Sequence, residues 1–373
     1  MGRILAVRAR RCLAGLALAL ACGHEELPFT VPEAVEASRY VEYGTWADDT
    51  AVCMGPALAR LDDHVEATAE FMAVSLPTSK IRYTWVPPEL EGEDTWFCTG
   101  SPQACHIGHN GRSYIFTTVL EQFHEVVHAV DYQALGEGHR VLTEGIAVYL
   151  GRDESYKTER FLKNFPAAFR DVVESDGPID YERSLHFVGS ILERDGVEKF
   201  KELRARVPVD ADYAAFAAAY LAVYGQDLDA ALAEMTTPIR PWFAEYDPCV
   251  GEPIPWGAGP ELEVKLRGRC GDGSFFGGGL VDDDPGFSKV FTIDIPAAGM
   301  YTMSVTGNTS NGKQLIGELS SCSDTEGSGV RSVWGSPGTG TLRPGRHRLA
   351  VGFPHAAEPA GELDLSLRYV AAP

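Results

Sequence analysis

The segment His124-Glu125-Val126-Val127-His128 constrains this 373-residue chain more than any other stretch. It lies within residues 118–134, a run without proline or glycine whose apolar residues recur at helical spacing. Residues four apart on a helix share a face, so the imidazoles of His124 and His128 should point to one place. Two such imidazoles are typical of a metal site. The alternative interpretation is a helix that exposes two surface histidines.

A carboxylate at ligand distance favours the metal site. Glu144 follows His128 after fifteen residues, which is enough for a turn and the start of a second, antiparallel helix. Two histidines and one glutamate form a three-ligand zinc site with an open fourth position for water. Glu125 lies beside His124, turned toward that water, where its carboxylate can accept a proton. We therefore expect Zn²⁺ on His124, His128 and Glu144, with Glu125 as the general base.

The surrounding sequence predicts a mostly helical domain over residues 41–250. Helical patterns cover residues 56–73, 180–194, 197–203, 213–224 and 228–235, and strand patterns cover residues 81–86 and 113–116. His106 and His109 lie between the two strand patterns, in a segment predicted to be a loop. Neither has helical spacing to the motif, so we interpret both as polar loop residues and not as ligands.

Composition changes near Cys249. Residues 251–260 are rich in proline and glycine and are predicted to form a linker. Beyond it, strand patterns separated by turns cover residues 261–267, 289–295, 301–305, 315–319, 347–353 and 363–369. About seven short strands over residues 261–373 are typical of a β-sandwich. The expected fold class is therefore α+β, with a mostly helical domain followed by an all-β domain.

The N-terminus has the pattern of an export signal. Residues 1–22 combine a basic start with an apolar run too short to span a bilayer, and small residues lead to Cys22. Residues 19–23 resemble a bacterial lipoprotein cleavage box, which predicts a lipidated Cys22 and possible membrane anchoring. Plain signal cleavage is the alternative. Acidic, proline-containing residues 23–40 would then form a tether, so we expect an exported protein, either secreted or held at the cell envelope.

The charge of the chain excludes one class of partner. The formal net charge is −21, and removing the signal, which carries four arginines and no acid, makes it about −25. Such a chain is repelled by nucleic acid, and no basic, aromatic-interleaved stretch argues otherwise. We expect no nucleic-acid partner and interpret the acidity as a contribution to solubility.

Six cysteines remain after Cys12 and Cys22, which suggests three disulfides in an exported chain. Nearness favours the pair Cys98–Cys105. Domain boundaries then favour Cys270–Cys322 and Cys53–Cys249. A thiolate metal site is a poor alternative because the chain has no Cys-x-x-Cys pair.

These motifs resemble a known group of enzymes. The motif at His124–His128, followed by Glu144-Gly145-Ile146-Ala147-Val148-Tyr149, resembles the gluzincin metallopeptidases, whose third zinc ligand is a glutamate. Residues 181–188 and 191–196 resemble the helix that follows the site in peptidase MA-like relatives. The resemblance covers about residues 50–245 and implies a zincin-like domain. Residues 289–307 look similar to part of the β-sandwich domains appended to secreted bacterial peptidases.

The resemblance implies a zinc metallopeptidase that hydrolyses peptide bonds of a peptide or protein substrate. His124, His128 and Glu144 would be the ligands, and Glu125 the general base. Relatives stabilise the oxyanion with a Tyr or His from a later helix, so Tyr181 and His186 are the candidates. Two alternatives are a catalytically silent zincin-fold surface protein whose sandwich recognises a partner, and a purely structural disulfide-stapled protein.

Overall fold

The structure is a computed structural model, and it describes most of the chain. The described residues are 30–46, 54–86, 98, 104–118, 122–151, 158, 162, 164–175, 177, 179–239, 242, 252–257, 259–268, 275–277, 286–308, 316–322, 329–333, 336–354 and 361–371. The expected export signal with Cys22, and the cysteines Cys53, Cys249 and Cys270, lie outside them.

The first part of the chain builds a five-stranded mixed sheet with the order β1-β2-β3-β5-β4. Its strands are β1 (Ala34–Ala37), β2 (Val41–Thr45), β3 (Ile81–Trp85), β4 (Ala104–His109) and β5 (Arg112–Thr117). Strands β2, β3 and β5 are parallel, and the edge strands β1 and β4 are antiparallel to their neighbours. Asn110 and Gly111, which join β4 to β5, both have positive φ, as a tight hairpin turn requires.

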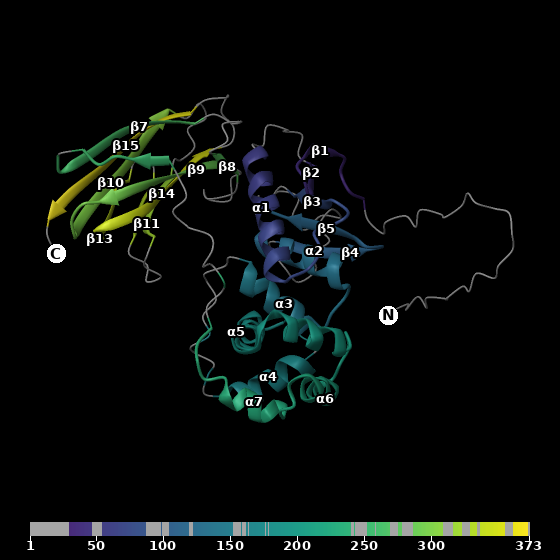
Figure 1. Cartoon of the computed structure of the whole chain (residues 1–373). Helices are drawn as coiled ribbons and strands as arrows, with labels where there is room; N and C mark the ends of the chain where they lie inside the picture. The colour runs from purple at the N-terminus through teal and green to yellow at the C-terminus, as the bar shows by residue number, and fades with distance from the viewer. Residues whose placement is uncertain are drawn as a thin grey trace, which may run out of the picture. The chain divides into compact units, whose positions relative to one another are not determined.

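Two helices, α1 (Gly55–Phe71) and α2 (Phe123–Leu135), pack against this sheet (Figure 1). Alternate strand residues face them because successive side chains of a strand point to opposite faces. The shared core contains Val41, Tyr43, Ile81, Tyr83 and Ile115 from the sheet, Leu58, Leu61 and Val65 from α1, and Val126, Ala129 and Val130 from α2.

Five further helices form a second core. They are α3 (Arg140–Leu150), α4 (Phe165–Glu174), α5 (Tyr181–Arg206), α6 (Tyr213–Tyr224) and α7 (Leu228–Glu234). Gly145 lets α3 and α5 approach closely, since a Cβ there would collide with Val188 and would lie 2.5 Å from the carbonyl oxygen of Ser184. Val127 of α2 belongs to this second core as well. Helix α2 is therefore packed between the sheet on one side and the helical layer on the other.

The C-terminal end of α2 is held by a buried ion pair. Arg204 of α5 lies 2.6 Å from the Oδ2 of Asp131, and both side chains are almost fully buried. Its guanidinium also donates to the carbonyl oxygens of Leu135 and Gly136, at 3.2 and 2.7 Å. Gly138 leaves room for it, because a Cβ there would be 2.8 Å from its Cζ. Arg204 thus caps α2, whose last carbonyl groups have no partner within the helix.

The C-terminal part is a β-sandwich. One sheet has the order β13-β10-β15-β7, and the other has the order β12-β11-β14-β9-β6 with β8 paired to β9. The strands are β6 (Glu252–Ile254), β7 (Glu261–Gly268), β8 (Phe275–Gly277), β9 (Gly286–Ile295), β10 (Gly299–Asn308), β11 (Ile316–Ser321), β12 (Gly329–Val333), β13 (Gly338–Leu342), β14 (Gly345–Pro354) and β15 (Gly361–Ala371). Side chains from both sheets meet in one core, which includes Phe291, Ile293, Tyr301, Leu349 and Leu367.

The α+β class is confirmed, whereas several boundaries differ from those expected. Residues 34–37, expected in the tether, form strand β1, and residues 252–254, expected in the linker, form strand β6. Among the described strands, β6 pairs with β9 alone, and such an edge position tolerates Pro253. The break expected at Gly196 is confirmed, because α5 consists of two helical segments that meet at this residue, where φ is 82° and the backbone is not helical.

The predicted disulfide Cys98–Cys105 is confirmed. Cys322 is also disulfide-bonded, with a partner outside the described residues.

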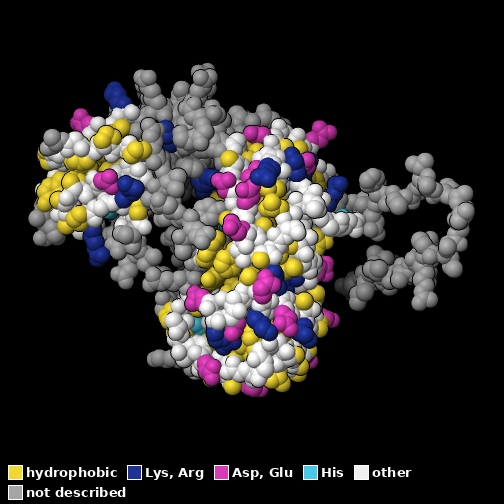
Figure 2. All heavy atoms as spheres, viewed as in Figure 1, with side chains coloured by type: hydrophobic (Ala, Val, Ile, Leu, Met, Phe, Trp, Pro, Cys, Tyr) yellow, Lys and Arg dark blue, Asp and Glu magenta, His cyan; other side chains and the backbone are white. Residues whose placement is uncertain are grey.

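None of the described helices is long and apolar enough to cross a membrane. In the view of Figure 2, acidic and basic side chains are interspersed over the described surface.

The Arg204–Asp131 pair generates a stability prediction. Arg204→Met should lower the free energy of unfolding by about 3–5 kcal/mol, because it leaves the Asp131 carboxylate buried without its cation. The measurement is urea unfolding followed by far-UV circular dichroism, which reports the helices. Arg206→Met is the matched control, since its side chain is 52% exposed and its pair with Glu202 lies at the surface. Equal effects of the two substitutions would contradict the prediction.

Candidate metal centre

Helix α2 presents both histidines of the motif on one side. His124 and His128 are four residues apart, and their Nε2 atoms lie 3.1 Å from each other. The helix cannot rotate about its own axis, because Val126 and Val130 are buried against the sheet and Val127 against the helical layer. Helical spacing sets the direction of the two imidazoles, and packing on both sides fixes it.

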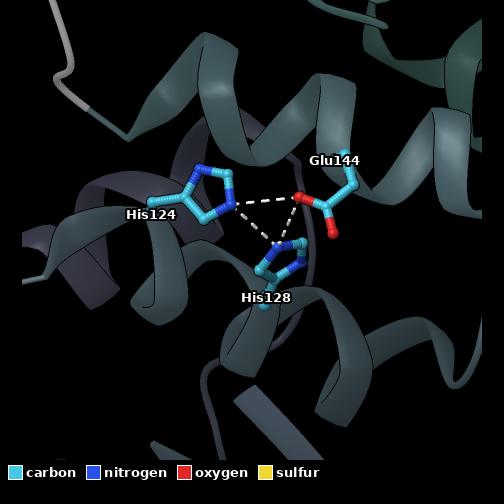
Figure 3. A group of neighbouring side chains, drawn as sticks. All are labelled: His124, His128 and Glu144. Carbon is cyan, nitrogen blue, oxygen red and sulfur yellow. Dashed lines mark hydrogen bonds and ion pairs between the residues drawn. The ribbon is translucent and has the colours of Figure 1, made fainter. Parts of the chain in front are cut away.

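Helix α3 supplies the carboxylate from the opposite direction. Its N-cap is His139, whose Nδ1 accepts from the backbone N–H of Val141 at 3.3 Å, while its Nε2 lies 3.2 Å from the carbonyl oxygen of Ala211. At the other end of α3, a Cβ on Gly151 would lie 2.9 Å from the Cα of His124. The end of α3 thus lies beside the start of α2, and this crossing brings Glu144 to both histidines (Figure 3).

The three side chains converge on one point. The Oε2 of Glu144 lies 3.1 Å from the Nε2 of His124 and 3.2 Å from the Nε2 of His128. Among the described residues, these three form the group of ligand atoms that could hold a metal ion. A triangle with such edges has corners about 1.8 Å from its centre, slightly less than the zinc–ligand distance of about 2.0–2.1 Å. An ion can therefore touch all three atoms, and this donor set fits Zn²⁺.

The electrostatics of the three groups is that of a strongly coupled cluster. Burial alone would lower the pKa of His128, but the charge of Glu144 and its hydrogen bond raise that pKa to about 9. Burial alone would raise the pKa of Glu144, but His128 and His124 hold that pKa well below the usual carboxyl range. Without a metal, a proton on His128 thus balances the carboxylate, and a metal cation competes with that proton for the same nitrogen.

Two acids of α2 accompany the ligands. Glu125 is only 7% exposed, and its charge contributes to the raised pKa of His128. Asp131 and Glu137 are the two acids close in sequence that could orient a ligand histidine. The structure gives them different environments. Asp131 is buried and contributes to the raised pKa of His128, whereas Glu137 is exposed. The Oδ2 of Asp131 is bonded to Arg204, so Asp131 acts on His128 through its charge.

Tyr181, one of the two candidate oxyanion donors, lies next to His124. It is the first residue of α5, and Asp180 caps this helix by accepting from the backbone N–H of Arg183 at 2.9 Å. The Tyr181 ring is 5.8 Å from the ring of His124, centre to centre, in an edge contact. Tyr181 is only partly buried, so its hydroxyl can contact a molecule bound at the centre.

His186 is not at the centre, and its placement does not fit the predicted role. Its side chain is fully buried in the helical core, against Phe165, and its Nε2 lies 3.0 Å from the carbonyl oxygen of Met235. Residues five apart on a helix point about 140° away from each other. Tyr181 and His186 therefore cannot both face the same ligands.

The structure also brings His106 to the centre, although the sequence placed it in a loop. His106 belongs to strand β4, and its ring lies 6.1 Å from the ring of His128. Burial and the charge of His128 lower the pKa of His106 to about 3, so its imidazole is neutral. The Asn110-Gly111 turn was the available signal, because Asn-Gly between two strand-like segments predicts a hairpin and would have made residues 104–109 a strand.

No family model matches this chain, and no curated protein matches it. Solved structures with partial likeness include the pre-peptidase C-terminal domain of collagenase from Bacillus anthracis (18% identity, TM-score 0.20, 32% of this chain and 96% of that one). Periplasmic inhibitors of g-type lysozyme named PliG also match, from Salmonella Typhimurium (9%, TM-score 0.20, 32% and 100%) and Aeromonas hydrophila (15%, TM-score 0.21, 32% and 96%). These TM-scores are too low for the likeness to carry an argument about fold or function.

The donor set predicts metal binding that depends on all three ligands. The chain should hold one zinc ion after equilibration with zinc, measured by elemental analysis, and His128→Ala should lose it. His109→Ala is the control, because His109 alternates with His106 on β4 and points to the other face. The apparent zinc affinity should rise as the pH is raised from about 7 to 10, since His128, with a pKa of about 9, loses its proton over that range. Zinc retained by His128→Ala would contradict this site.

Buried neutral histidines predict a loss of stability in acid. Burial lowers the pKa values of His139 and His186. The unfolded chain therefore binds protons below about pH 6.5 that the folded chain does not, and the free energy of unfolding falls as the pH falls. His186→Gln removes one of these titrating groups. The slope of the free energy of unfolding against pH should then become smaller by up to about 1 kcal/mol per pH unit. Urea unfolding of the zinc-free protein at about pH 6 and pH 5 measures it, and an unchanged slope would contradict the assignment.

Proposed function

We propose that this protein is an exported zinc-dependent metallopeptidase with a zincin-like domain of the gluzincin type. The observation that carries the proposal is the convergence of the His124, His128 and Glu144 ligand atoms, which all lie within 4.8 Å of one another. Glu125 is the next residue of α2 after His124. A purely structural zinc site is closed by four protein ligands, whereas three ligands leave a position for water or substrate. When bound, zinc polarises the scissile carbonyl group and makes water more acidic.

Glu125 is the proposed general base. Its carboxylate accepts a proton from the attacking water as the water oxygen bonds to the carbonyl carbon of the peptide. When the carbon–nitrogen bond breaks, Glu125 delivers this proton to the leaving nitrogen. The products are a carboxylic acid and an amine, which become a carboxylate and an ammonium ion when the acid proton passes to the amine, and Glu125 returns to its starting state. The near-complete burial of Glu125 supports this role, because a carboxylate with little water around it exchanges protons mainly with what the site binds.

Tyr181 is the proposed oxyanion donor. Its ring contacts His124 from the side of α5, and a phenol hydroxyl donates a hydrogen bond to an oxygen that gains negative charge. The start of a capped helix gives this side chain a defined position.

Export is supported by the Cys98–Cys105 disulfide, because disulfides persist in oxidising compartments. The export signal over residues 1–22 is part of this proposal. Lipidation of Cys22, which would anchor the protein to a membrane, is proposed with it. The substrate class is a peptide or protein. The β-sandwich is proposed as an accessory domain of the enzyme.

The experiment is cleavage of a mixed peptide library by the zinc-loaded chain without residues 1–22. Glu125→Gln keeps the shape of the side chain, so it should retain zinc while turnover falls by about 10²–10⁴-fold. Tyr181→Phe should retain zinc and lower kcat by about 10²–10³-fold with little change in KM. Tyr213→Phe is the control, because the Tyr213 hydroxyl pairs with Asp229 in the helical layer.

Mass spectrometry of the products identifies the cleaved bonds and separates internal cutting from trimming of chain ends. If the parent binds one zinc ion and cuts nothing, the peptidase proposal is wrong, and the catalytically silent binding protein takes its place. Equal cutting by the parent and Glu125→Gln would remove Glu125 from the mechanism. Unchanged kcat in Tyr181→Phe would do the same for Tyr181.

A further inference from the structure

Strand β4 directs His106 toward the metal centre. In the β4–β5 hairpin, His106 lies opposite Ile115 and Gly108 lies opposite Ser113. Ile115 belongs to the core beneath α1 and α2, and the hydroxyl of Ser113 donates to the carbonyl oxygen of Ala129 at 3.2 Å. Directly paired residues share a face of the sheet. His106 and Gly108 therefore face α2.

The His106 ring contacts two residues of α2 that are one turn apart. It lies nearly parallel to the ring of His128, with an interplanar angle of 19°, and its centre is 5.6 Å from the ring of Tyr132. Gly108 makes this arrangement possible, because a Cβ at that position would collide with the Tyr132 ring. The slot for His106 is thus shaped by a ligand histidine, an aromatic ring and a glycine.

The Nε2 atom of His106 is buried and has no hydrogen-bond partner among the described residues. Leaving such an atom unpaired costs about 1–3 kcal/mol, and a phenylalanine ring would fill the same slot without that cost. The nitrogen lies outside the set of three ligand atoms. Such an atom requires an explanation, and a molecule bound at the adjacent centre can supply its partner.

We propose that His106 is a further binding residue of this centre and that its Nε2–H donates a hydrogen bond to a carbonyl oxygen of the molecule bound there. This inference rests on the proposed function, since that molecule is a peptide substrate. His106 acts from the β4 side, next to His128, whereas Tyr181 acts from the α5 side, next to His124. A carbonyl-bearing ligand is then held from both sides of the ligand pair. Hydrogen bonds at such sites often align only when the ligand is bound.

The test measures ligand binding independently of turnover. The chain is loaded with cobalt(II), and acetohydroxamate, a small carbonyl-bearing metal ligand, is titrated while visible absorption is recorded. His106→Phe should retain one cobalt ion and an unchanged or higher Tm, and should bind acetohydroxamate about tenfold more weakly, the loss of roughly one hydrogen bond. His106→Gln keeps a donor and should retain most of the affinity. His109→Phe, on the opposite face of β4, should match the parent.

Equal acetohydroxamate affinity in the parent and His106→Phe would overturn the inference, and so would a parent that binds no cobalt. If His106→Phe does not fold, His106→Leu is measured in the same way, with the same two readings. A lower Tm with unchanged affinity would show a packing role only and would also overturn it. Failure of the proposed function can be told apart from failure of this inference. If the parent cuts no peptide but His106→Phe still weakens acetohydroxamate binding, the peptidase proposal is wrong and the binding role of His106 stands.

Discussion

The packing of α2 between two cores is the constraint on which the rest of the site depends. Val126 and Val130 are buried against the sheet, and Val127 is buried in the helical layer. A helix held on one side can roll about its axis, but a helix held on two sides cannot. The Arg204 guanidinium also fixes its C-terminal end, through Asp131 and the last carbonyl groups. The histidine side chains inherit this rigidity, and a metal site needs it because small displacements of its ligands are costly.

Much of the site could be predicted from the sequence because it depends on local geometry. Two histidines four residues apart converge on any regular helix, and a second antiparallel helix is the simplest way to bring Glu144 back to them. His106 could not be found in this way, because its position depends on strand pairing with β5 and on the face that β4 turns toward α2. Arg204 was equally hidden, since it lies 73 residues from Asp131 and reaches it only after α5 bends at Gly196.

The errors in the predicted fold have physical reasons as well. Six strands of the sandwich were expected from alternating apolar residues, and β7, β9, β10, β11, β14 and β15 match them. Strands β12 and β13 lack a strong pattern because glycine and serine or threonine occupy many of their positions. His186 is predicted from a resemblance that supplies a Tyr or His from a later helix, and this does not say which side of α5 the residue occupies. Residue type predicts what a side chain is able to do, and helix geometry decides whether it can act at a given place.

The Cys98–Cys105 bond has a consequence beyond joining two segments. Cys105 and His106 are neighbours on β4, so they point to opposite faces of the sheet, and a slip of one residue would exchange them. Among the described strands β4 pairs with β5 alone, and such an edge strand is prone to a slip of this kind. The disulfide acts as a register lock that keeps the cysteine on one face and the histidine over α2. Together with the Asn110-Gly111 turn, which also fixes the register of β4 on β5, the disulfide keeps His106 on the side of His128.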